Sequence, residues 1–155
     1  MHTRLVVLAC VAVTAVALAA CGGGGGSPSN DDVKADYEPV RTDLLGLGNQ
    51  VAGTIQAAKN ESDEQLASQF QNYSNQLADI HDRLDAIETN DATESEMDAL
   101  ATDVETLKGD TDDIVTAANN HDPSAAFTAA RKLVQDSVKL KSDREALDKT
   151  LGVTG

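Results

Sequence analysis

The sequence has few of the residues that catalysis and cofactor binding rely on. Its 155 residues include no tryptophan, two phenylalanines, two tyrosines, three histidines and two cysteines. Cys10 lies in the apolar first twenty residues (the leader), which leaves a single cysteine, Cys21, and therefore no disulfide within the rest of the chain. Basic residues are also scarce, with 12 lysines and arginines against 26 aspartates and glutamates. Because so acidic a surface repels phosphate, we expect no nucleic-acid partner.

The two histidines beyond the leader lack the neighbours that would make them ligands or catalysts. His81 follows a helical seam residue and is predicted to face solvent, and His121 lies in a predicted turn. Neither belongs to a Glu-x-x-His motif, and no Cys-x-x-Cys-His motif is present. The acidic cluster 110–113 lacks the glycine and glutamate spacing of a calcium loop. The sequence therefore predicts no metal site, no cofactor, no catalytic residues and no enzymatic activity.

The first twenty residues have the pattern of an export signal. Arg4 precedes an apolar stretch, residues 5–20, interrupted only by Thr14 and too short for an ordinary membrane-spanning helix. The stretch ends Leu18-Ala19-Ala20-Cys21, which resembles the lipobox of bacterial lipoproteins. That resemblance implies cleavage after residue 20 and a diacylglycerol on the Cys21 thiol, often with a further acyl chain such as palmitate on the new amino terminus. We therefore expect a lipid-anchored protein on the periplasmic or extracellular side of a cell membrane.

The residues that follow Cys21 are typical of a flexible tether. Residues 22–26 are all glycine, and Ser27-Pro28-Ser29 follow them. A stretch of this composition behaves as a random coil. The domain organisation is therefore predicted as a cleaved signal at 1–20, a lipidated tether at 21–30 and a folded domain at 31–152.

Four segments of the folded domain have helical periodicity, and they cover residues 31–59, 62–89, 93–119 and 123–151. The second and third have unbroken seams of alternating three- and four-residue spacing. Their members are Leu66, Phe70, Tyr73, Leu77, Ile80, Leu84 and Ile87, then Met97, Leu100, Val104, Leu107, Thr111, Ile114 and Ala118. Ser62 with Gln65, and Thr93 with Glu96, predict capping boxes at the two starts.

The first and fourth segments are less regular. The first has an apolar stripe from Val33 to Ile55 but also contains Gly46, Gly48 and Gly53, which indicate either close approach to a neighbouring helix or a local kink. The fourth has Asp122 as its N-cap, Pro123 at its first position and Gly152 as its C-cap. Its stripe is Ala126, Ala130, Leu133, Leu140, Leu147 and Leu151, widened by Phe127, Val134 and Val138, and it places Arg144 at a seam position.

Four helices of similar length joined by short links predict an all-α domain. Since short links favour antiparallel neighbours, the expected fold is an up-down-up-down four-helix bundle. A pair of long hairpins that completes its core only as a homodimer is the alternative that the pattern leaves open.

The charge distribution is the main hint about partners. The four segments carry net charges of −2, −5, −7 and +2. An acidic face at Asp103, Glu105, Asp110 and Asp113 is therefore a candidate docking surface for a basic envelope or extracellular protein, with steering that weakens in salt. We expect a protein-interaction module that acts as an adaptor, inhibitor or accessory subunit. The alternative is a small-molecule-binding or sensory bundle, for which Arg144 is a candidate anion site.

Overall fold

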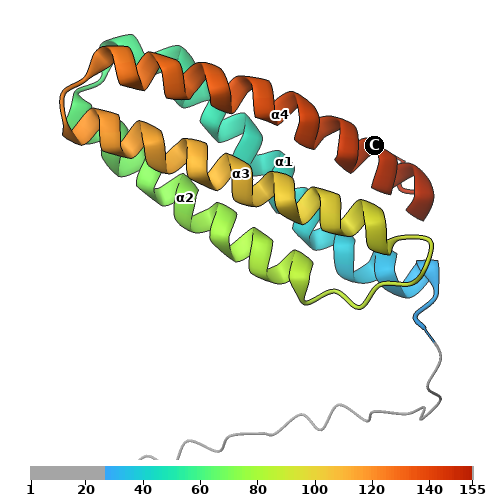
Figure 1. Ribbon diagram of the computed structural model, residues 1–155. Helices are drawn as coiled ribbons and strands as arrows, with labels where there is room; N and C mark the ends of the chain where they lie inside the picture. The colour runs from blue at the N-terminus through green and yellow to red at the C-terminus, as the bar shows by residue number, and fades with distance from the viewer. Residues whose placement is uncertain (1–26, 155) are drawn as a thin grey trace, which may run out of the picture.

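The computed structural model describes residues 27–154 and contains four α-helices, joined by short links (Figure 1). They are α1 (Asn30–Ala57), α2 (Asp63–Asp85), α3 (Glu94–Asn119) and α4 (Pro123–Leu151), with a short 3₁₀ helix, η1 (Ala58–Asn60), after α1. Within residues 27–154 there is no β-strand, and no helix is long and apolar enough to span a membrane. The predicted all-α fold of four packed helices is confirmed. The leader, Cys21 and the glycines of the tether lie outside the described residues.

Three of the four helix starts are capped by side chains. Ser29 and Ser62 each form a capping box, the second with Gln65 as predicted. Asp122 accepts hydrogen bonds from the backbone N–H groups of residues 124 and 125, so that Pro123 begins α4 without an unsatisfied donor. Gly152 ends α4 in the left-handed conformation, with φ of 64°.

The predicted capping box of Thr93 and Glu96 is wrong. Thr93 is fully buried and its side chain caps no helical N–H. Its hydroxyl instead takes part in a turn with Asn90, whose backbone N–H donates to the Thr93 Oγ1 at 3.2 Å. The Asn90 side chain donates in turn to the carbonyl of Pro28 and to the side chain of Asn30. These contacts tie the α2–α3 link to the start of α1, and α2 ends at Asp85, four residues before the expected 89.

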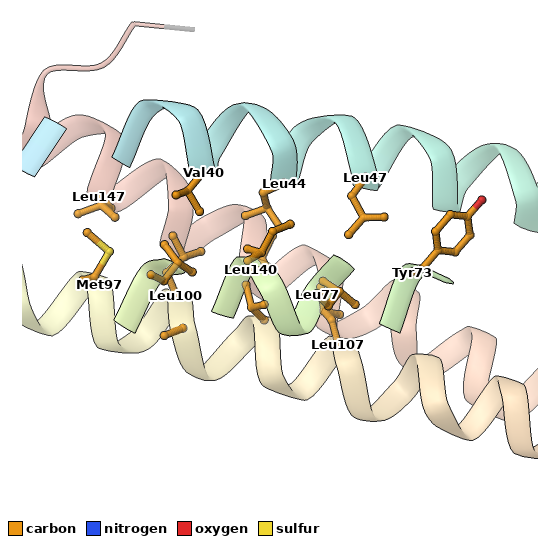
Figure 2. Packing of buried hydrophobic residues seen from close by; sticks show 14 of the residues in the cluster. Val40, Leu44, Leu47, Tyr73, Leu77, Met97, Leu100, Leu107, Leu140 and Leu147 are labelled. Carbon is orange, nitrogen blue, oxygen red and sulfur yellow. The ribbon is translucent and has the colours of Figure 1, made fainter. Parts of the chain in front are cut away.

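The core is built from the predicted seams. All seven seam residues of α3 are buried, and so are the five central seam residues of α2. Leu44 and Leu47 of α1 point toward Leu77 of α2, Leu107 of α3 and Leu140 of α4, as Figure 2 shows. This burial of the a and d positions explains why the periodic spacing predicted the core correctly.

The four helices are packed unequally. α3 lies between α2 and α4 and packs closely on both, whereas α1 packs less on α2 and least on α4 (Figure 1). The sequence of α1 is also unfavourable for a helix, because it contains Pro39, which removes one backbone hydrogen bond, and three glycines. A Cβ added at Gly46, Gly48 or Gly53 would meet no atom within 4 Å. Close approach to a neighbouring helix is therefore not the reason for these glycines.

Candidate functional site: an apolar groove between α1 and α4

The sparse packing of α1 on α4 leaves an open groove along the bundle. It consists of two hollows of about 560 Å³ each, and they adjoin one another because Ile55 and Val134 line both. Leu77, Leu107 and Thr111 of the other two helices line the first hollow. Most of the remaining lining residues are aliphatic or small. A volume of this size is in the usual range for binding sites.

A cluster of polar side chains closes the groove at one end. Asp148 of α4 is buried and accepts hydrogen bonds from the Tyr37 hydroxyl at 3.0 Å and from the Arg41 Nε, which lies 2.9 Å from both carboxylate oxygens. Burial, and then the Asp148 charge, raise the pKa of Tyr37 above its ordinary value. Beyond this cluster, Asn30 and Lys34 of α1 donate to the carbonyls of Thr150 and Gly152. α1 and α4 are therefore held together firmly at this end.

Arg144 is buried at its predicted seam position, between this polar cluster and the groove. Its guanidinium lies 3.7 Å from the Asp148 carboxylate and 3.5 Å from that of Glu145. The two acids balance its charge, which is the ordinary requirement for a buried arginine. Its role as an anion site stays a prediction.

At the other end of the groove, α1 is held by α2 rather than by α4. Thr54 shares a hydrogen bond of 2.7 Å with the Tyr73 hydroxyl and donates to Gln69 at 2.8 Å. Gln69 in turn donates to Glu61, which follows η1. With α1 held on this side by α2, its central turns stand away from α4.

Several large apolar side chains in the groove or beside it are exposed. Phe127, Val134 and Val138 of α4 are 67%, 51% and 66% exposed, and Leu45 of α1 is 39% exposed. The expectation that the three α4 residues widen the buried stripe is wrong, because α1 does not lie close enough to cover them. Contiguous apolar surface of this kind marks interaction sites on soluble domains.

The charged residues that line the groove are all basic. They are Arg131, Lys141 and Arg144, and no aspartate or glutamate lines either hollow. The Arg131 guanidinium lies 5.9 Å from the centroid of the Phe127 ring. Lys141 reaches Glu145 at 3.7 Å, on the exposed side of α4. In a chain of net charge −14, an apolar groove with only basic residues along it is distinctive.

The candidate acidic face is divided by the fold. Glu105 and Asp113 are exposed, but Asp103 and Asp110 are buried at the α3–α4 interface, so the expectation that they face solvent is wrong. Lys139 donates to Asp103 at 2.6 Å, and Lys132 donates to Asp110. Burial raises the pKa of both aspartates above the ordinary value, although the lysines oppose the shift. These two carboxylates join helices and are not offered to a partner.

The two predicted surface histidines lie away from the groove. His81 has the carboxylate of Asp85 at 3.4 Å, one helical turn away. His121 is exposed in the α3–α4 link, where its Nδ1 lies 2.7 Å from Asp63. In the described part of the chain, no group of three or more histidine, cysteine, aspartate or glutamate side chains is arranged to hold a metal ion.

Comparison of the chain with protein-family models, with curated proteins and with solved structures finds no match in any of the three. The geometry of the molecule and its sequence are therefore the basis for assigning a function.

Proposed function

We propose that the chain is a lipid-anchored, non-catalytic protein-interaction module of the bacterial cell envelope, and that its partner binds in the α1–α4 groove. In this proposal Cys21 holds the lipid outside the cytoplasm, a flexible tether follows, and residues 31–152 form an antiparallel up-down-up-down bundle. The protein is then an adaptor, inhibitor or accessory subunit that acts close to the membrane surface.

Hydrogen bonds between helix ends support the antiparallel arrangement. The start of α1, the α2–α3 link and the end of α4 meet at one end of the bundle, through Asn30, Asn90 and Thr150. The start of α2 and the α3–α4 link meet at another place, through Asp63 and His121. Since each helix then begins at the end where its predecessor finishes, the four directions alternate.

The exposed apolar side chains of α4 carry the proposal of a protein partner. Phe127, Val134 and Val138 lie along one face with more than half of each side chain in solvent. Leaving them there costs the free energy that burial would gain, about 25 cal/mol per Å² of apolar surface. A protein partner that covers this face recovers that free energy, and a partner of extended shape covers all three.

Crosslinking in the cells that produce the protein tests this function. A photo-crosslinking amino acid at position 138 stands at the rim of the groove, one helical turn from the lining residues Val134 and Lys141, and the same amino acid at position 146 lies on another exposed side of α4. We expect a discrete crosslinked protein from position 138 and none from position 146. The proposal is wrong if position 138 gives no adduct, or if both positions give the same adducts.

The small-molecule alternative uses the same groove, because its volume suits a ligand of ordinary size. It predicts that a metabolite raises the melting temperature in a concentration-dependent manner. It also predicts that the position-138 probe labels no protein.

A further inference from the structure

The groove has the length and spacing that suit a helix. Its α4 wall extends from Ala126 to Arg144, which is roughly 27 Å at 1.5 Å per residue. The exposed residues Phe127, Val134 and Val138 are spaced by seven and four residues, so α4 has a second heptad seam beside the one that faces the core. A ligand that meets this seam along its length is an elongated object of about five helical turns.

The opposite wall provides room for a helix backbone. Leu45, Gly48 and Ala52 of α1 line the groove at spacings of three and four residues. Gly48 has open space where its Cβ would be, and Ala52 is exposed. The α1 wall therefore has small residues at Gly48 and Ala52 where a helix backbone can approach, beside large apolar ones such as Leu45, and a helix in a groove packs on a surface of this kind.

The exposure of the α4 seam argues against a lipid acyl chain as the occupant. Side chains that are 51–67% exposed form a ridge on the surface and not the wall of a closed channel. A single acyl chain is narrower than a helix, so it would leave much of this ridge and of itself in water. A helix about 10 Å across covers both walls.

Charge argues against a second copy of the same face. The charged residues that line the groove are all basic. Glu145 and Asp148, the acids that pair with Lys141 and Arg144, lie outside the lining, so two such grooves facing each other would bring basic residues together. Like charges brought together at an interface are unfavourable and suppress that pairing. An occupant with carboxylates along its flanks is instead attracted by these basic residues.

We propose that the α1–α4 groove binds an amphipathic helix of a partner protein, apolar on the face it presents and flanked by aspartate and glutamate. This inference rests on the proposed function and specifies the chemistry of the partner. Phe127, Val134 and Val138 contact the apolar face, and Arg131 and Lys141 contact the acidic flanks.

A displayed peptide library tests the proposal without knowledge of the natural partner. The library consists of helical peptides with apolar residues at heptad positions, and each flanking position varies between glutamate, glutamine and lysine. The mature protein, anchored in nanodiscs of uncharged phosphatidylcholine, serves as the target. We expect recovered peptides to be rich in glutamate and to bind more weakly as salt rises.

Matched variants on α4 localise the binding. Val134→Asn with Val138→Asn should weaken a recovered peptide at least tenfold, while Ala146→Asn, at an exposed position outside the groove, leaves it unchanged. Arg131→Gln with Lys141→Gln should weaken binding several-fold and flatten its salt dependence, while Lys149→Gln does neither. Since these positions are exposed, circular dichroism should show the same helix content in all variants.

Four outcomes overturn the inference: recovery of no peptide, recovery of lysine-rich or unbiased peptides, binding that ignores the Val134 and Val138 substitutions, or displacement of the peptide by an equimolar amount of palmitate. If one of these occurs while position 138 still crosslinks to a protein in cells, the helix is wrong and the interaction function stands. If position 138 crosslinks to nothing, both proposals fail.

Discussion

Lys132 extends across the surface of α4 to a carboxylate of Asp110 that water does not reach. The aspartate is fully buried, whereas the lysine side chain is 55% exposed. Seven residues away along each helix the arrangement recurs, with Lys139 on Asp103. In both pairs the second carboxylate oxygen, Oδ2, has no hydrogen-bond partner among residues 27–154. The α3–α4 interface therefore contains two ion pairs in which the aspartate is buried and the lysine is partly exposed.

The first prediction concerns the loss of the lysine. Lys132→Met leaves the Asp110 charge buried with no partner, which is the costly way to break an ion pair. We expect it to lower the melting temperature at pH 7 several times more than Lys149→Met, which removes an exposed lysine. Replacing both Asp110 and Lys132 by leucine should recover most of the loss.

The pH dependence of that loss follows from the direction of the pKa shift. Burial already raises the pKa of Asp110, and without Lys132 the rise is larger. The folded protein then binds this proton more tightly than the unfolded chain, so the penalty is present at neutral pH and fades as pH falls toward the ordinary aspartate value. Thermal melts of Lys132→Met against wild type between pH 4 and pH 7 should converge at the acidic end. A constant difference would contradict this account.

The second prediction concerns His121. Its hydrogen bond to Asp63, and then the charge of that carboxylate, raise its pKa above the ordinary value of 6.5. The protonated imidazolium favours this contact, so its stabilising effect is full below the ordinary pKa and is lost as pH rises through the raised one. An NMR titration of His121 should give a higher midpoint in wild type than in Asp63→Asn. Equal midpoints would mean that the two side chains do not meet in solution.

The third prediction concerns the glycines of α1. Since Gly46 and Gly53 are helical and open space surrounds their Cβ positions, alanine at either site should raise the free energy of unfolding by about 0.5–1 kcal/mol. Gly152→Ala should do the opposite, because φ of 64° disfavours a side chain. Urea denaturation of the three variants checks both signs together.

The fourth prediction concerns the anchor. Cys21→Ser should leave the protein unprocessed or release it from the membrane fraction, because the thiol is the only site for the proposed diacylglycerol. Cys10→Ser, within the leader, should leave anchoring intact. Mass spectrometry that finds a mature amino terminus other than an acylated Cys21 would contradict the assignment.

Local pattern predicted the parts of the fold that depend on local interactions. The apolar residues from Leu66 to Ile87 lie on one face of a helix, and that face is buried whichever helix packs against it. Their spacing alone was therefore enough to predict which residues form the core. Thr93 was misread because its turn depends on Asn90, which is held by the start of α1 some sixty residues away. A capping motif is defined by residues three positions apart, so it carries no information about a contact between residues so distant in the sequence.

The candidate site needed the tertiary structure. Asp103 directly precedes the seam residue Val104 and Val134 directly follows the stripe residue Leu133, yet Asp103 is 5% exposed and Val134 is 51% exposed. The difference is set by the neighbour: α4 packs closely on α3, whereas α1 stands away from α4. The sequence does contain an irregularity in α1, namely Pro39 together with three glycines, but the glycines were interpreted as a close approach or a kink and did not predict the open groove.

The meeting of Asn30 with Thr150 gives the described domain a nearly circular connectivity. The two helices that border the groove are the first and the last, so they are the one neighbouring pair that no link joins. A short linker from residue 152 back to residue 29, with new ends opened at residues 120–122, would turn α4 and α1 into a covalent hairpin. In such a permutant the walls of the groove become sequential, and a partner segment built into that linker would be held beside the surface it is proposed to bind.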